Sequence, residues 1–172
     1  MTSQKLIVLS GLPGSGKSML AEGLSRKLSV PVFSVDPIEA AMWRSAKAQT
    51  GIAAYDVAIA LADEHLRLGH SVIVDAVNAV EAPRAAWRNL ASKYQADLKI
   101  VECICADETV HRRRIEARVR NIDGMAEVSR ARVIERRAEY QAWTDRRLTL
   151  DTSIDAPESL LAEALNYVRA SP

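Results

Sequence analysis

The segment GLPGSGKS at residues 11–18 decides the fold, because it has the pattern of a glycine, four residues, a second glycine, a lysine and a serine. An apolar run of strand length, residues 5–10, precedes it, and Leu20, Leu24 and Leu28 follow at the spacing of one helix face. A strand, a glycine-rich loop and a helix form the context in which this pattern binds the phosphates of a nucleotide. We refer to residues 11–18 as the phosphate loop.

The residue types of the phosphate loop explain how it would hold an anion. Glycines let the backbone turn so that successive N–H groups point at one phosphate, and the helix that begins near Lys17 adds the positive end of its dipole. Lys17 would bring positive charge to the β- and γ-phosphates, and the Ser18 hydroxyl would bind Mg²⁺. An ordinary glycine turn is the alternative, but the full pattern rarely arises by chance. The predicted nucleotide-binding residues are Gly11, Gly14, Ser15, Gly16, Lys17, Ser18 and Met19.

Length and composition favour a single soluble domain, residues 1–172, with a formal net charge of only +1. No apolar run approaches the length of a membrane span, so we expect no membrane partner. Residues 1–4 lead directly into the first apolar run and leave no room for a signal peptide, which favours the cytoplasm. In that reducing compartment Cys103 and Cys105 would remain free thiols.

Short apolar runs alternate with amphipathic helical patterns along the rest of the chain. This alternation predicts an α/β fold, a three-layer sandwich in which helices cover both faces of a parallel sheet. We expect one helix to begin at Pro37, another to end at Gly69, and a third to be capped by Asp107. A charged helix is expected over residues 127–143. The predicted strands lie near residues 5–10, 32–35, 71–75, 98–105 and 147–151.

Carboxylates follow two of the predicted strands: Asp36 comes after the second and Asp75 ends the third. Because ligands of such sheets bind beyond the carboxyl ends of the strands, both side chains should lie near the phosphate loop. Asp36 would accept the proton of an attacking hydroxyl, and Asp75 would bind Mg²⁺ directly or through water. A helix cap alone is the alternative for Asp36. Asn78 could orient substrate or water, or be only a turn residue.

Arginines are concentrated in one segment after the cysteines. Arg114 and Arg118 are four residues apart, so on a helix they could reach the same anion. A break at residues 122–124 precedes a second helix, and the two helices with their loop would form a closing lid over approximately residues 112–130. Arg114, Arg118 and Arg120 would stabilise the transferred phosphoryl group. The alternative is a solvated charged face, which we predict for Arg112, Arg130, Arg132, Arg136 and Arg137.

Together the phosphate loop, Asp36, the VDAVN run at residues 74–78 and the arginine pair resemble the small P-loop kinases. The nearest groups are the AAA-like ATP-binding kinase domains, which are similar to polynucleotide 5′-hydroxyl kinases, chloramphenicol phosphotransferase and zeta-toxin kinases. The resemblance extends from about residue 5 to residue 168. It implies a five-stranded sheet in the order 2-3-1-4-5, ATP with Mg²⁺, Asp36 as base, and lid arginines including Arg118 at the nucleotide. It also implies an adenine site near residues 152–153.

Two features bear on the acceptor. The run at residues 33–42 resembles the corresponding stretch of the chloramphenicol enzyme, which acts on a small apolar alcohol. In polynucleotide kinases an arginine stands three residues after the base, whereas Glu39 stands here, and a carboxylate would repel nucleic acid. We therefore expect an ATP-dependent phosphotransferase that acts on a hydroxyl group of a small molecule.

The acceptor pocket should be formed by residues 37–68. Tyr55 and Trp87 could add aromatic surface to it, or simply pack in the core. Two other functions stay open: a polynucleotide or nucleoside 5′-hydroxyl kinase, because arginines exceed acidic residues over residues 112–147, and a non-catalytic ATP-binding switch. The predicted substrate residues are Asp36, Glu39, Trp43, Arg44 and Asn78.

Overall fold

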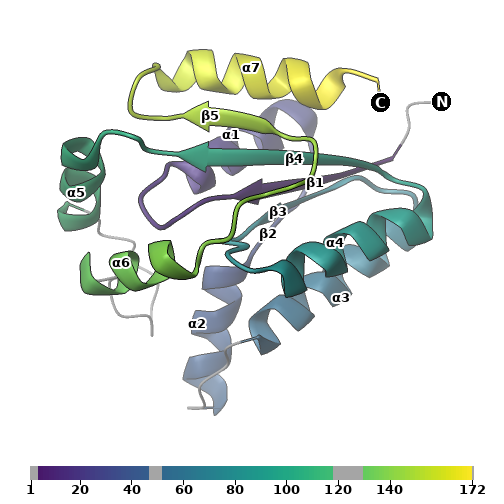
Figure 1. The fold of residues 1–172 in the computed structure, drawn as a ribbon. Helices are drawn as coiled ribbons and strands as arrows, with labels where there is room; N and C mark the ends of the chain where they lie inside the picture. The colour runs from purple at the N-terminus through teal and green to yellow at the C-terminus, as the bar shows by residue number, and fades with distance from the viewer. Residues whose placement is uncertain (1–3, 47–51, 118–129, 172) are drawn as a thin grey trace.

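The computed structural model describes residues 4–46, 52–117 and 130–171. The five strands are β1 (Lys5–Ser10), β2 (Val32–Ser34), β3 (Val72–Asp75), β4 (Asp97–Ile104) and β5 (Leu148–Asp151). All their pairings are parallel, and the sheet has the order β2-β3-β1-β4-β5 (Figure 1). The predicted α/β class and the strand order implied by the resemblance are therefore confirmed.

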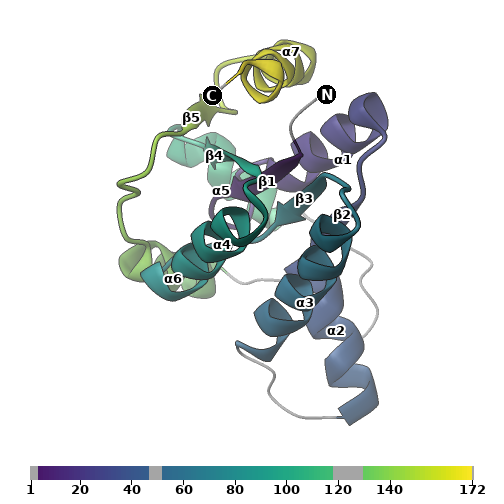
Figure 2. The same cartoon turned by 90° about the vertical axis from the view of Figure 1, so that its right-hand side faces the viewer.

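Helices cover both faces of the sheet. They are α1 (Lys17–Leu28), α2 (Val35–Ala46), α3 (Ala53–Arg67), α4 (Glu81–Tyr94), α5 (Glu108–Glu116), α6 (Arg130–Glu139) and α7 (Pro157–Arg169). α1 and α7 lie on one face, and α3 and α4 lie on the other (Figure 2). α5 and α6 lie beyond the edge toward which the strand arrows point. Within the described ranges, none of these helices combines the length and apolar character needed to cross a membrane.

Alternation along β1 explains how one sheet serves two apolar cores. Leu6 and Val8 pack with residues of α3 and α4, while Ile7 and Leu9 pack with residues of α1 and α7. All four side chains are at most 1% exposed. A strand between two helical layers has no solvated face, so the four central positions of β1, residues 6–9, are all apolar. This is why continuous apolar runs in the sequence predicted the strands.

The strand register brings the ends of three strands to one level. Asp75 of β3 pairs with Leu9 of β1 on one side and with Ser34 of β2 on the other. The phosphate loop begins two residues after Leu9, and Asp36 lies two residues after Ser34. The phosphate loop, Asp75 and the start of α2 therefore leave the sheet at the same edge, where ligands of such sheets bind.

Two boundaries differ from the predicted ones. α2 begins one residue before Asp36, so this carboxylate lies in the first turn of the helix and not at the end of β2. α6 ends at Glu139, although a helix was expected to reach Trp143. Arg84 of α4 donates to the carbonyl groups of Gln141 and Ala142 in the segment that follows, so these groups find their partners outside a helix.

Candidate active site

The phosphate loop joins β1 to α1 through backbone conformations that favour glycine. Gly14 and Gly16 have φ of 81° and 83°, in the left-handed region that side chains rarely adopt. A Cβ atom on Gly14 would also lie 2.7 Å from Ile115 Cδ1 of α5, which is closer than such atoms approach. The glycine at position 14 is therefore required by the backbone and by the packing of α5 against the loop.

A pocket of about 230 Å³ gathers most of the predicted nucleotide-binding residues. Lys17 is the first residue of α1 and only 3% exposed. A buried cation at the N-terminus of a helix is suited to hold an anion. Two of the predicted residues, Gly11 and Ser15, line a different pocket. The pocket of 230 Å³ is lined by Gly14, Gly16, Lys17, Ser18, Met19 and Arg114.

Arg114 of α5 is fixed by the loop that follows β5. Its Nη1 donates to Thr152 Oγ1 at 2.6 Å, and its Nη2 donates to the Thr152 carbonyl at 2.7 Å. Thr152 Oγ1 also lies 2.9 Å from the carbonyl oxygen of Ser15. Thr152 thus joins α5 and β5 to the phosphate loop and sets the position of Arg114 beside the nucleotide pocket. Arg118 and Arg120 lie outside the described residues, as does most of the predicted lid.

Asp75 has the environment of a metal ligand. The side chain is buried, and its Oδ2 accepts a hydrogen bond from Ser34 Oγ at 3.0 Å. Its Oδ1 is buried with no hydrogen-bond partner among the described residues. Mg²⁺ commonly takes one or two carboxylates together with phosphate oxygens and water. A buried oxygen left without a partner at the end of β3 fits this role, and Ser18 would be its companion ligand.

Asp36 and Glu39 lie one turn apart on α2, and both are half-buried. The charges of both carboxylates affect the pKa of Tyr55 on α3. Burial raises the pKa of the Tyr55 hydroxyl, Asp36 and Glu39 raise it further, and the nearby Arg136 of α6 lowers it. α2, α3 and α6 therefore bring two carboxylates, a phenol and a guanidinium into one region beside the sheet edge.

Of the other predicted substrate residues, Asn78 contacts this region: its backbone N–H donates to the Tyr55 hydroxyl at 3.1 Å. Trp43 and Arg44 lie farther along α2 and are exposed. Asn78 is fully buried: its Nδ2 donates to the Leu9 carbonyl at 3.2 Å, and its Oδ1 accepts from Trp87 Nε1 at 3.0 Å. With a φ of 51°, Asn78 is the turn residue that the alternative interpretation described. Trp87 belongs to the core and offers no surface to an acceptor.

His111 of α5 contacts the phosphate loop, which the sequence did not indicate. Its Nε2 lies 2.8 Å from the Pro13 carbonyl, and Arg137 Nη2 of α6 lies 3.2 Å from its Nδ1. Because a guanidinium can only donate, Nδ1 accepts from Arg137 and Nε2 donates to the Pro13 carbonyl. Arg137 also pairs with Glu108 at 3.0 Å. Arg137 is exposed, as the predicted solvated face requires, and in addition it links α6 to α5.

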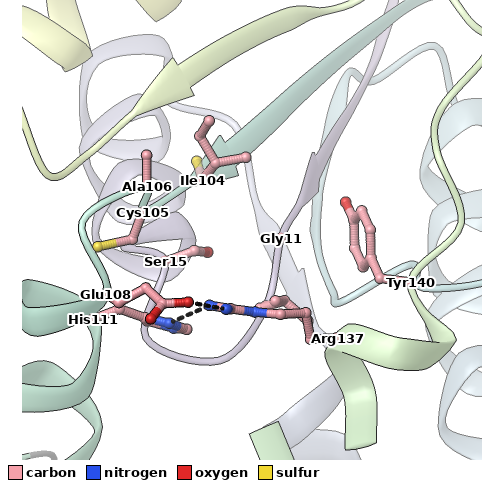
Figure 3. Close-up of a pocket in the computed structure, with 11 residues that line it drawn as sticks. Gly11, Ser15, Ile104, Cys105, Ala106, Glu108, His111, Arg137 and Tyr140 are labelled. Carbon is pink, nitrogen blue, oxygen red and sulfur yellow. Dashed lines mark hydrogen bonds and ion pairs between the residues drawn. The ribbon is translucent and has the colours of Figure 1, made fainter. Parts of the chain in front are cut away.

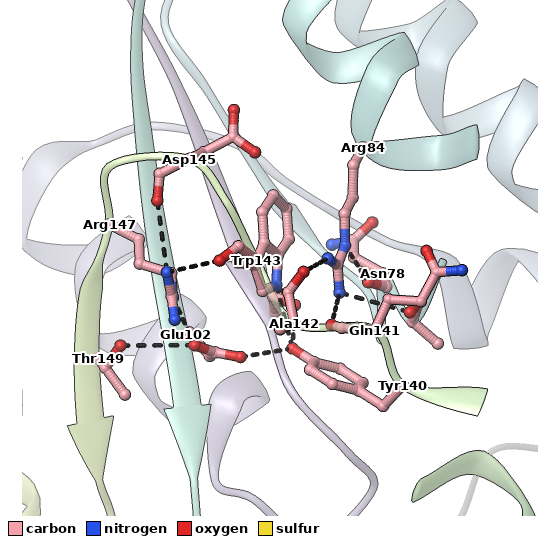
Figure 4. A network of polar contacts seen from close by, with 12 residues as sticks. Asn78, Arg84, Glu102, Tyr140, Gln141, Ala142, Trp143, Asp145, Arg147 and Thr149 are labelled. Atoms are coloured by element: carbon pink, nitrogen blue, oxygen red, sulfur yellow. Dashed lines mark hydrogen bonds and ion pairs between the residues drawn. The ribbon is translucent and has the colours of Figure 1, made fainter. Parts of the chain in front are cut away.

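A buried arginine holds the segment after α6 (Figure 4). Arg84 is 2% exposed, and burial lowers the pKa of its guanidinium. It donates to the carbonyls of Asn78, Gln141 and Ala142 at 2.8, 2.7 and 3.0 Å. The sequence held one signal for this role, because Arg84 precedes Trp87 by three residues and so shares the apolar face of α4.

Tyr140, the first residue after α6, ties this segment to the sheet (Figure 4). Its hydroxyl lies 2.8 Å from Ser10 Oγ and donates to Glu102 Oε1 at 3.0 Å. The other oxygen of Glu102 accepts from Arg147 Nε at 2.6 Å. Burial raises the pKa of Tyr140 to about 12. Since Ser10 directly precedes the phosphate loop, this network fixes the start of the loop to the end of α6.

Comparisons with known proteins agree with this geometry. A sequence family described as an AAA domain matches residues 6–143. The fold is similar to that of a candidate kinase from Chloroflexus aurantiacus, with a TM-score of 0.78, 20% identity, and coverage of 96% of this chain and 99% of that one. It is also similar to the APS kinase CysC of Mycobacterium tuberculosis in complex with AMPPNP and APS (TM-score 0.65, 22% identity, coverage 98% and 99%). A third similar structure is a gluconokinase from Sinorhizobium meliloti 1021 (TM-score 0.68, 18% identity, coverage 98% and 93%). No curated protein matches the sequence.

Proposed function

Because the chain belongs to the AAA domain family and shares the fold of several kinases, we propose that it transfers the γ-phosphate of ATP to a hydroxyl group of a small molecule. One observation carries the proposal: the phosphate loop, the buried oxygen of Asp75 and the carboxylate of Asp36 leave the sheet at one edge. A protein that only binds ATP needs the first two, but transfer to an alcohol also needs a group that accepts the proton.

Each residue has a separate role in this proposal. Lys17 balances the charge of the β- and γ-phosphates, and Arg114 lines the nucleotide pocket. Ser18 and Asp75 would hold Mg²⁺, which when bound would supply further positive charge to the phosphates. Asp36 accepts the proton of the acceptor hydroxyl and orients its oxygen. A new bond forms between that oxygen and the γ-phosphorus, the bond to the leaving oxygen of ADP breaks, and the proton passes to Asp36.

The charges near Asp36 support a small acceptor. Glu39 lies one turn farther along α2 and would repel the phosphate backbone of an oligonucleotide. The formal net charge of +1 gives no strong attraction to a polyanion. The charge of Arg136 of α6 lowers the pKa of Tyr55, and Arg136 also pairs with Glu139 at 2.9 Å, so a polar group of the acceptor would have to share this guanidinium with Glu139. The similar structures add APS and gluconate to the compounds worth testing, since two of them are an APS kinase and a gluconokinase.

The test is phosphate transfer from ATP measured across a panel of hydroxyl compounds, namely alcohols, antibiotics, nucleosides, sugars, gluconate, APS and oligonucleotides with a free 5′-hydroxyl. Lys17→Ala should lose both ATP binding and transfer. Asp36→Asn should bind ATP as the wild type does, yet transfer phosphate about 10²- to 10⁴-fold more slowly, because it lacks the proton acceptor. Asp56→Asn is the matched control, since Asp56 also lies in the first turn of a helix but is exposed.

The panel also separates the alternatives. Unchanged transfer by Asp36→Asn would show that the base is assigned to the wrong residue. Preferred transfer to oligonucleotides would replace the small-molecule proposal with a polynucleotide kinase. ATP binding without transfer to any compound of the panel would favour a nucleotide-dependent switch.

A further inference from the structure

A second pocket, of about 300 Å³, lies on the β4 side of the phosphate loop (Figure 3). Its lining shares Gly11 and Ser15 with the phosphate loop but does not include Lys17, Ser18, Asp36 or Asp75, the residues to which the proposed chemistry assigns charge, metal and proton. The volume is at the lower end of the range for small-molecule sites. We call it the β4 pocket; it is lined by Gly11, Leu12, Ser15, Cys103, Ile104, Cys105, Ala106, Glu108, His111, Arg137 and Tyr140.

Much of the β4 pocket is uncharged. Cys103 and Ile104 come from the end of β4, and burial raises the pKa of the Cys103 thiol to about 12, so this group stays neutral. Tyr140 stands across the pocket from Ser15 (Figure 3). Its hydroxyl is already bonded to Glu102 and Ser10, so the phenol offers the pocket mainly its ring. These surfaces suit the apolar part of a ligand.

Two polar groups are available to a ligand in this pocket. Ser15 is only 1% exposed, and its Oγ has no hydrogen-bond partner among the described residues. A buried hydroxyl without a partner is free to bond to a ligand. Arg137 brings a guanidinium that pairs with Glu108, whose side chain is 83% exposed. An ion pair with so exposed a partner contributes little, because water competes for both charges. Arg137 can therefore exchange Glu108 for a carboxylate that is better shielded from water.

We propose that the β4 pocket binds a small carboxylic acid with an apolar body. The carboxylate would bind Arg137 in place of Glu108, and the apolar body would lie against Ile104 and the Tyr140 ring. A hydroxyl donor, Ser15 Oγ, is available to a second acceptor atom of the ligand. The chemistry of this site differs from that of the nucleotide pocket, where Lys17 and the glycines favour phosphate.

A ligand in the β4 pocket would alter the contacts that support the phosphate loop. Gly11, Leu12 and Ser15 of the loop form part of its lining. Arg137 also orients His111, which holds the carbonyl of Pro13. A carboxylate that moves Arg137 would therefore change the support of the loop. Because such coupling is reciprocal, nucleotide and carboxylate would change each other's affinity by the same factor.

The test uses hydrocinnamate and hydrocinnamyl alcohol, which share an apolar body and differ in the carboxylate. Titration calorimetry on the full chain should give a Kd for the acid about tenfold lower than for the alcohol. Arg137→Met should remove this preference, whereas Arg132→Met, on the same helix and paired with Glu135, should keep it. Ile104→Trp should weaken both ligands by filling the pocket, and Ile134→Trp on the exposed side of α6 should not.

Equal affinities for acid and alcohol in the wild type would overturn the proposal, as would a preference that survives Arg137→Met. Binding that is unaffected by Ile104→Trp would place the ligand elsewhere and also overturn it. Far-UV circular dichroism of each variant verifies that it is folded. Repeating the titration with saturating ATP should change the Kd of hydrocinnamate, and an unchanged Kd would contradict the coupling. The first titrations need no phosphate transfer, so they remain decisive even if the kinase proposal fails.

Discussion

Gly14 and Gly69 share a left-handed backbone, with φ of 81° and 83°, but differ in the space around them. A Cβ on Gly14 would lie 2.7 Å from Ile115 Cδ1 and 3.1 Å from the His111 ring, whereas a Cβ on Gly69 would meet nothing within 4 Å. We predict that Gly14→Ala weakens ATP binding by about tenfold or more, because the new side chain strains the left-handed backbone of the phosphate loop and displaces the Ile115 and His111 side chains that pack against it. Titration calorimetry with ATP measures this effect.

Gly69→Ala is the matched control for that substitution. It should cost about 1–2 kcal/mol of unfolding free energy in urea, the usual penalty for a side chain in this backbone region, and leave ATP affinity unchanged. If the two variants bound ATP equally well, the contact between α5 and the loop would have no part in binding.

Tyr140→Phe isolates a single hydroxyl in the network behind the phosphate loop. The substitution removes the donor to the buried Glu102 and the contact with Ser10. We expect the free energy of unfolding to fall by about 1–3 kcal/mol, since a buried carboxylate oxygen loses its partner. Tyr94→Phe provides the comparison: its hydroxyl donates to Asp63, which keeps a second donor in Lys93, so the loss should be smaller. Urea unfolding of both variants measures the two losses, and a loss for Tyr94→Phe as large as that for Tyr140→Phe would contradict the prediction.

The same tyrosine predicts a pH dependence. Its pKa is raised from 10.0 to about 12 in the fold, so between these values the folded chain keeps a proton that the unfolded chain releases. The stabilisation is fully present below pH 10 and is lost as the pH rises toward 12. Because Tyr140 is only partly buried, the loss should be on the order of 1 kcal/mol. Subtracting the unfolding profile of Tyr140→Phe from that of the wild type isolates it, and a difference that stays constant over this range would contradict the prediction.

At the scale of elements, Thr152 is where α5, β5 and the phosphate loop meet. Its Oγ1 accepts from Arg114 and lies 2.9 Å from the Ser15 carbonyl. Thr152→Val keeps the shape but removes these bonds, so Arg114 should keep its bond to the backbone carbonyl of residue 152 but be less firmly positioned beside the nucleotide pocket. We predict that the Kd for ATP rises by roughly three- to tenfold. Thr149→Val, three residues earlier on β5 and with a 3.4 Å contact to Glu102, should leave that Kd unchanged. If both substitutions raised the Kd for ATP equally, the effect would come from a general disturbance of β5 and its loop and not from the bonds of Thr152.

How much the sequence could predict depends on how far apart in the chain the deciding contacts lie. The phosphate loop and the five strands follow from local patterns, and Asp107 caps α5 through bonds to residues two and three positions away. The end of α6 could not be predicted this way, because Arg84 and Ala142 are 58 residues apart. The contact of the exposed Arg137 could not be predicted for the same reason, since its partner Glu108 lies 29 residues away on another helix.

The same distinction between local and distant contacts separates the two pockets of the candidate site. The residues lining the nucleotide pocket are neighbours in the chain, apart from Arg114, so the pattern of glycines and Lys17 was sufficient. The β4 pocket draws its lining from the loop, β4, α5 and the end of α6. Their side chains meet only through the topology, and the same residue types on a different topology would form no pocket. Asn78 shows the opposite error, in which a polar residue near the site is used entirely by the fold.

At the scale of the whole molecule, two apolar clusters share one sheet. Neighbouring residues of β1, such as Val8 and Leu9, belong to opposite clusters, so loss of either cluster exposes the same strand. The clusters should therefore unfold together, as one domain. Trp87 and Trp143 lie in the cluster beneath α3 and α4, whereas circular dichroism reports all helices, including α1 and α7.

We predict that fluorescence and circular dichroism give coincident urea transitions. Trp43→Phe removes the fluorescence of the exposed Trp43, so that the signal comes from Trp87 and Trp143. ATP with Mg²⁺ at about 100 times its Kd should raise the unfolding free energy by about 2.7 kcal/mol with both probes, because ligand binding to one cooperative unit stabilises all of it. Asp36→Asn should retain this shift and Lys17→Ala should lose it. Two separate transitions, or a shift confined to one probe, would show that the layers unfold independently.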